Sequence, residues 1–146
     1  MPAGRRVLFL DDDQARGEAF LAANPGSIWV QTAADCLAEL AESWDEIHLD
    51  HDLGGEQFVD HARDDCGMAV VRWLCETPRP HLKDARFVVH THNQDAACVM
   101  VFHLQVTGYR VTQCPFGTAP PLPGGCNVQV RQSWLGRVLS WVPGRR

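Results

Sequence analysis

Short apolar runs alternate along the chain with stretches that carry apolar residues at helical spacing, and this alternation constrains the fold most strongly. The apolar runs predict five strands, at residues 7–10, 27–31, 46–50, 86–90 and 109–113. Strands that are apolar throughout are typical of a parallel sheet buried on both faces, in which each connection is a right-handed crossover. The sequence therefore predicts an α/β domain with a five-stranded parallel sheet.

Five helices are predicted between and after these strands. They are expected at residues 14–23, from Thr32 to about Trp44, around Met68, Val71, Leu74 and Cys75, from Asn93 to Gly108, and around Val130, Trp134, Val138 and Trp141. Helices that follow strands in this way cover both faces of a doubly wound sheet. Five such units in a chain of this length favour the flavodoxin-like strand order 2-1-3-4-5.

The whole chain, residues 1–146, is expected to be one domain. A chain of 146 residues with 45% hydrophobic residues is long enough to bury a core without further cross-links. Residues 115–146 are predicted to form a Pro/Gly-rich loop and the last helix.

Composition and charge narrow the classes of partner. The net charge of -5 argues against a long nucleic acid, although a small nucleotide or an RNA end stays possible. No apolar stretch approaches membrane-spanning length, and the run after Arg6 is too short for a signal peptide. The six cysteines include no C-x-x-C pair and are expected to be reduced thiols, so a cytoplasmic protein is predicted.

Polar residues gather where three of the predicted strands end. In the order 2-1-3-4-5 the first, third and fourth strands are neighbours, so their carboxyl ends meet at the point where such sheets bind ligands. The residues that follow these strands are Asp11, Asp12, Asp50, His51, Asp52, His90, Thr91, His92 and Asn93. The sequence therefore predicts a functional site at this edge of the sheet.

Four aspartates gathered in this way would repel one another. Two carboxylates about 4 Å apart repel by about 1 kcal/mol in water and by about four times as much at an effective dielectric constant of 20. Either shared protons or a divalent cation would relieve this repulsion, and the neighbouring imidazoles favour the cation. Carboxylate oxygens favour Mg²⁺ or Mn²⁺, whereas added imidazole ligands would shift the preference toward Mn²⁺, Zn²⁺, Fe or Ni²⁺.

Strand alternation adds an expectation about side-chain direction. Asp50 and Asp52 should point to one side and His51 to the other, while His90 and His92 should share a side. Purely structural roles are also open, since Asp12 or Asp13 could cap the first helix and Asn93 the fourth. The polar stretch GGEQFVDHARDD, residues 54–65, is longer than a usual strand-to-helix connection and is typical of loops that cover a site.

The paired Asp11 and Asp12, with Asp50 or Asp52, resemble the acidic pocket of response-regulator receiver domains, where Mg²⁺ lies beside a phosphorylated aspartate. Thr91 stands where receivers carry a Ser or Thr. Receivers also carry a lysine at the end of the fifth strand, but residues 109–116 contain none. An aspartyl phosphate would therefore lack its main cationic partner.

A closer resemblance is to the cyclic-phosphate processing receiver domain family. The matching motifs are LDD at residues 10–12, LDHDLG at 49–54, a helix that begins at Gly67 and contains Trp73-Leu74, and H-x-x-N at 90–93. The resemblance covers residues 7–104. Arg16 stands near the position of an arginine usual in the family, without the accompanying proline, and Cys66 stands where a threonine is usual.

The resemblance implies a metal-dependent hydrolase acting on 2',3'-cyclic phosphates of nucleotides or RNA ends. The residues expected to bind the metal are Asp11, Asp12, Asp50 and Asp52, and those expected to act in acid–base catalysis are His51, His90 and His92. Thr91, Asn93 and Arg16 are expected to bind the phosphate. The alternative is a non-catalytic receiver-like module that binds a phosphorylated ligand or a protein partner.

Overall fold

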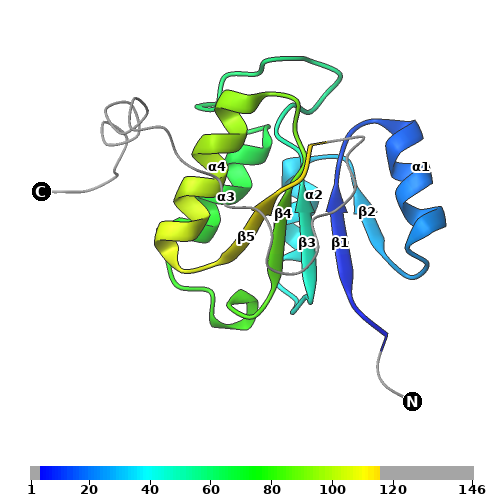
Figure 1. Ribbon diagram of the computed structural model, residues 1–146, viewed down its shortest axis with the longest axis horizontal. Coiled ribbons are helices and arrows are strands. Elements are labelled where there is room, and N and C mark those ends of the chain that lie inside the picture. The colour runs from blue at the N-terminus through cyan, green and yellow to red at the C-terminus, as the bar shows by residue number, and fades with distance from the viewer. Residues whose placement is uncertain (1–3, 116–146) are drawn as a thin grey trace, which may run out of the picture.

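The computed structural model describes residues 4–115, which form a five-stranded parallel sheet in the order β2-β1-β3-β4-β5 (Figure 1). The strands are β1 (Val7–Leu10), β2 (Ile28–Val30), β3 (Glu46–Leu49), β4 (Arg86–Val89) and β5 (Arg110–Gln113). The predicted fold class and strand order are therefore confirmed. The predicted last helix and nearly all of the Pro/Gly-rich loop lie outside the described residues.

Four α-helices connect the described strands: α1 (Gln14–Ala23), α2 (Ala33–Glu39), α3 (Gly67–Glu76) and α4 (Gln94–Thr107). A short 3₁₀ helix, Pro80–Leu82, precedes β4. Side-chain oxygens of Asp13, Thr32 and Asn93 cap α1, α2 and α4 by accepting hydrogen bonds from backbone N–H groups of the first turn. Gly108 ends α4 in the left-handed conformation that glycine adopts most readily, with φ of 96°.

The helices divide between the two faces of the sheet. Side chains of α2, α3 and α4 form the main apolar core with Leu8, Ile47 and Phe87 and their neighbours on one face. Helix α1 packs on the other face, where the Phe20 ring stacks on Phe9 with 4.1 Å between ring centroids. Figure 1 shows α1 across the strands from α3 and α4.

The second helix is shorter than predicted. It ends at Glu39, whereas apolar spacing predicted a helix to about Trp44. Leu40 and Trp44 are buried, as the spacing requires, but the Trp44 indole N–H donates to the Glu39 carbonyl at 2.9 Å. The Glu39 carbonyl thus accepts from the Trp44 side chain and, in a tighter turn, from Glu42 N at 3.1 Å, so the α-helix does not continue.

Three backbone hydrogen bonds continue the sheet one residue past the strand ends. Asp11 N donates to Val30 O at 3.1 Å, Asp50 N to Leu10 O at 3.0 Å and His90 N to Leu49 O at 2.8 Å. These bonds fix the first residue after β1, β3 and β4 as firmly as the strands themselves. Separately, none of the helices in residues 4–115 is long and apolar enough to cross a membrane.

Gly67 is expected to be irreplaceable. An alanine Cβ at this position would lie 2.0 Å from the Asp50 carbonyl oxygen and 2.9 Å from His51 Cα, and backbone atoms cannot move away cheaply. Gly67→Ala is therefore expected to lower the free energy of unfolding by about 1–3 kcal/mol or more, measured by urea denaturation. Gly4→Ala is the control, because a Cβ there meets nothing within 4 Å; equal stability of the two variants would contradict this packing.

Candidate functional site

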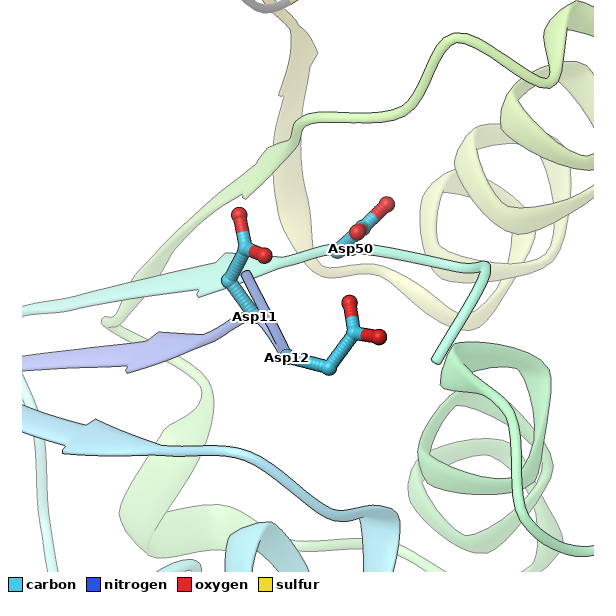
Figure 2. Close-up of side chains that lie close together, drawn as sticks. All are labelled: Asp11, Asp12 and Asp50. Atoms are coloured by element: carbon cyan, nitrogen blue, oxygen red, sulfur yellow. The ribbon is translucent and has the colours of Figure 1, made fainter. Parts of the chain in front are cut away.

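Asp11, Asp12 and Asp50 form a cluster of carboxylates at the ends of β1 and β3, here called the three-aspartate cluster. One oxygen from each lies within 4.8 Å of the others. Figure 2 shows Asp11 and Asp12 on the chain that leaves β1, and Asp50 on the chain that leaves β3. Asp11 and Asp50 are buried and Asp12 is half-buried. The structure therefore brings together three of the four aspartates predicted to bind a metal.

Arg16 lies directly against this cluster. Its Nε and Nη2 donate to the two oxygens of Asp11 at 2.7 and 2.8 Å, and Nη2 lies 3.5 Å from Asp50 Oδ2. The hydrogen bonds to Asp11 are the main reason that the pKa of Arg16 rises above its ordinary value. The Arg16 guanidinium, which the sequence predicts to bind phosphate, thus supplies positive charge to the aspartates in this structure.

Asp50 is the carboxyl group whose ionisation this environment opposes most clearly. Burial, together with the charge of Asp11, raises its pKa to about 8, despite a hydrogen bond from His51 N and the nearby Arg16. At neutral pH Asp50 therefore holds a proton in the absence of a metal.

Asp52 lies in the same cavity but has a different set of partners. Its Oδ1 contacts His51 Nδ1 at 2.7 Å and accepts from Asn93 Nδ2 at 3.3 Å. Backbone N–H groups of Phe58 and Val59 donate to it at 2.8 and 3.1 Å. Burial alone would raise the pKa of Asp52, but these hydrogen bonds outweigh burial and lower it. Asp52 is not part of the three-aspartate cluster and holds the loop after β3 instead.

A cavity of about 510 Å³ opens above the three-aspartate cluster. Its lining comprises Asp12, Asp13, Gln14, Arg16, Asp50, Asp52, Gly55, Glu56, Gln57, Phe58, Thr91, His92 and Asn93. The loop predicted to cover the site therefore contributes residues 55–58, and its Gly55 N–H donates to Asp12. Gly54 and Gly55 both have φ of 75°, a conformation that favours glycine and brings the loop back toward the cluster.

The three predicted catalytic histidines do not lie together. His92 is exposed and lines the cavity. His51 is fully buried, and its Nε2 has no hydrogen-bond partner among residues 4–115. His90 lines a different cavity with Phe9 and Phe20. His90 and His92 were expected to share a side, but β4 ends at Val89, so strand alternation does not extend to them.

His90 belongs to a hydrogen-bonded chain that the sequence reasoning did not identify. The chain joins Glu46 Oε1 to His48 Nε2 at 2.6 Å, His48 Nδ1 to His90 Nε2 at 2.5 Å, and His90 Nδ1 to Cys114 O at 2.6 Å. Burial lowers the pKa of His90 to about 4, with the nearby His48 adding to the effect. The sequence signal was the alternation in β3, which places Glu46 and His48 on the same face.

The three residues predicted to bind the phosphate differ in the contacts that they make. Arg16 contacts Asp11 and lines the cavity. Thr91 Oγ1 accepts from Asn93 N at 3.1 Å. Asn93 uses its side-chain oxygen to cap α4 and its nitrogen to contact Asp52, as the structural interpretation expected for the cap. All three line the cavity, and their contact with a phosphate stays a prediction.

The three-aspartate cluster fits a divalent cation. Its ligands would all be carboxylate oxygens, which is the donor set that Mg²⁺ and Mn²⁺ take, and within residues 4–115 no histidine belongs to it. Two of the three carboxyl groups are buried, and one resists ionisation until a positive charge compensates it. Asp11, Asp12 and Asp50 are the residues that would hold the ion.

The metal-free protein is expected to lose stability as the pH rises from about 4 to about 8. Asp50 keeps its proton in the folded state up to a pKa of about 8, whereas the unfolded chain releases it near the ordinary value of about 3.9. The folded state binds more protons in this range, so the free energy of unfolding falls with rising pH. Asp50→Asn is expected to remove this decline and to stabilise the protein at pH 8 by on the order of 2 kcal/mol.

Urea denaturation with a chelator at several pH values measures this effect. Asp84→Asn replaces an exposed aspartate outside the cavity and should follow the wild-type profile. A difference between wild type and Asp50→Asn that does not grow between pH 5 and pH 8 would show that Asp50 is ionised throughout.

Binding of Mg²⁺ is expected to release about one proton per ion at pH 7 and fewer at pH 9, because Asp50 must ionise to become a ligand. The apparent affinity should rise with pH and level off above about pH 8. Calorimetric titration in two buffers of different ionisation enthalpy measures the proton release. An affinity that is independent of pH between 6 and 8 would mean that Asp50 is not a ligand.

Comparison with known proteins places this chain in a family. The sequence model of the cyclic-phosphate processing receiver domain matches residues 6–105. No curated protein matches the chain.

Solved structures of response regulators share the fold at low sequence identity. A response regulator from Burkholderia pseudomallei, solved with a phosphorylated aspartic acid, a calcium ion and citrate, is 17% identical with a TM-score of 0.57; the match covers 79% of this chain and 61% of that one. A CheY-like receiver domain from Methylobacillus flagellatus is 19% identical with a TM-score of 0.53, covering 80% and 90% of the two chains. The HemR receiver domain from Leptospira biflexa is 16% identical with a TM-score of 0.54, covering 97% and 99%.

The structural neighbours thus agree with the observed strand order, and the family match spans well over half of the sequence. The resemblance seen in the motifs is confirmed: this chain belongs to the cyclic-phosphate processing receiver domain family.

Proposed function

We propose that this domain is a metal-dependent phosphoester hydrolase that opens 2',3'-cyclic phosphates of nucleotides or RNA ends. The observation that carries the proposal is the three-aspartate cluster beside a cavity that Thr91, His92 and Asn93, the residues just before α4, also line. The same cavity thus contains acidic oxygens for a cation and the N-cap of a helix, whose N-terminus favours anions. With a cation held by the three-aspartate cluster, a phosphate group in this cavity would meet favourable charge from the cation and from the helix end.

A divalent cation held by Asp11, Asp12 and Asp50 would stabilise the negative charge that develops on the phosphoryl oxygens. The reaction adds water to phosphorus and breaks one phosphorus–oxygen bond of the strained five-membered ring. A proton must leave the attacking water, and a proton must reach the ribose oxygen that departs.

His92 is the histidine best placed to move these protons, because it lines the cavity and is exposed. An imidazole in contact with substrate can accept and return a proton near neutral pH. His51 and His90 do not line the cavity and do not belong to the three-aspartate cluster. In this proposal they support the site without contacting the substrate. His51 would do so through Asp52, which positions both Asn93 and the loop after β3.

Arg16 has two possible anionic partners in the cavity. It lies bidentate on Asp11, and a guanidinium binds phosphate oxygens with the same paired geometry. Once a cation neutralises Asp11, a phosphate oxygen would be a competing anionic partner for the Arg16 guanidinium. This exchange accommodates both the observed ion pair and the phosphate role that the sequence predicts.

The same ion pair favours the alternative function, a non-catalytic module that binds a phosphorylated ligand. Asp11 is engaged by Arg16, and the Asn93 side chain is engaged by α4 and Asp52. A module of this kind needs no group that moves protons. Binding without turnover would identify it.

The enzyme is expected to convert 2',3'-cyclic AMP to a 2'- or 3'-monophosphate with Mg²⁺ or Mn²⁺, and to stop when a chelator is added. Asp50→Asn is expected to lower kcat/KM by on the order of 100-fold or more, and His92→Ala by about 100-fold. Asp84→Asn is the control and should keep full activity.

Product chromatography measures the conversion. Activity that survives chelation would contradict the role of the three-aspartate cluster, and tight binding with no product would replace the enzyme with the module. Intact mass after incubation with acetyl phosphate should show no phosphoryl adduct, since the chain's one lysine, Lys83, donates to Thr107 O instead of ending β5.

A further inference from the structure

Phe58 is the most exposed large apolar side chain in residues 4–115. Its relative exposure is 77%, and it lines the rim of the acidic cavity beside Gln57. Single exposed apolar residues are common on protein surfaces, so exposure alone identifies no role. The position matters here, because this is an aromatic ring at the mouth of a cavity otherwise lined mainly by polar and charged side chains.

The backbone of Phe58 is held in an unfavourable conformation. It is the one non-glycine residue in the described part of the chain with a positive φ, 53°. Asp52 fixes this turn by accepting from the N–H groups of Phe58 and Val59, and the Val59 side chain is buried on the inner side. The turn therefore buries a valine and presents the neighbouring phenyl ring to solvent.

Strain of this kind persists where the surrounding structure enforces it, and it often marks a binding site. Bulky residues adopt positive φ only rarely, whereas asparagine does so much more readily. An exposed asparagine would suit both the backbone and the solvent at this position. Phenylalanine suits neither the positive φ nor the exposure to solvent. A role other than folding of the loop therefore accounts for it better.

We propose that Phe58 is a stacking platform for the base of a nucleotide whose phosphate lies over the three-aspartate cluster. The inference rests on the proposed function and assigns its substrates to nucleosides that carry a 2',3'-cyclic phosphate, whose products are the 2'- or 3'-monophosphates. The cavity volume of about 510 Å³ is in the range of small-molecule sites and leaves room for a sugar between phosphate and base. Aromatic stacking accepts any base, so the platform would distinguish nucleotides from sugar phosphates.

Asp52 makes the platform part of the site. Its two oxygens accept hydrogen bonds from the Phe58 turn, and the same carboxylate contacts His51 and Asn93. Asn93 lines the cavity in which the phosphate would bind. The Asp52 carboxylate thus connects the backbone of Phe58 to Asn93 through two hydrogen bonds. The backbone that carries the ring is therefore held in place by a residue of the cavity lining.

The test compares two probes that are not substrates, adenosine 2'-monophosphate and ribose 5-phosphate, by calorimetry on the Mg²⁺-loaded full chain. Wild type is expected to bind the adenosine probe roughly 10-fold more tightly. Phe58→Asn should remove this advantage, while Phe58→Tyr should keep it. Gln57→Ala, at the neighbouring position in the same cavity lining, should also keep it.

Thermal unfolding separates this role from a structural one. Phe58→Asn is expected to have an unchanged or higher Tm, because asparagine accepts the positive φ; a structural role would lower the Tm instead. Equal binding of both probes by wild type, binding of neither, or an adenosine advantage that survives in Phe58→Asn would each overturn the platform.

The hydrolysis assay remains a separate readout. If Phe58→Asn hydrolyses 2',3'-cyclic AMP with the same KM as wild type, the result would support the enzyme and overturn the platform. A Phe58-dependent adenosine advantage without any turnover would support the platform and overturn the hydrolase.

Discussion

The repulsion among Asp11, Asp12 and Asp50 is the interaction on which the rest of this site depends. Sheet hydrogen bonds fix Asp11 and Asp50 one residue past their strands, so these two cannot move apart. The structure compensates with the Arg16 guanidinium and with a proton on Asp50, whose pKa is about 8. Both compensations are reversible. A divalent cation can displace the proton and take over the neutralisation that Arg16 supplies.

Asp52 shows how one acidic motif divides into two roles. In LDHDLG the first aspartate joins the three-aspartate cluster, while the second receives hydrogen bonds from a histidine, an asparagine and two backbone N–H groups. Its neighbours favour the ionised form without any metal. The motif thus combines a group that can bind a cation with a group that organises the cavity wall.

The sequence predicted the parallel sheet, its strand order and the meeting of three strand ends, because apolar alternation and crossover geometry determine these features. It did not predict that α2 ends at Glu39, since the hydrogen bond from the Trp44 indole depends on tertiary packing. Nor did it separate His90 from His92, because alternation applies only within a strand, and β4 ends before both. The pairing of Arg16 with Asp11 needed the position of α1 relative to β1, which spacing alone does not give.

The hydrogen-bonded chain from Glu46 to Cys114 crosses three neighbouring strands of the sheet. A carbonyl oxygen can only accept, so His90 Nδ1 donates to Cys114 O, and the other nitrogen of the His90 ring, Nε2, contacts His48 Nδ1. Glu46 is held ionised by His48, Arg86 and Arg5, so it accepts from His48 Nε2. The two imidazoles therefore connect a side chain of β3, the residue after β4 and the backbone just after β5, so three neighbouring strands are joined through side chains as well as through the backbone ladder.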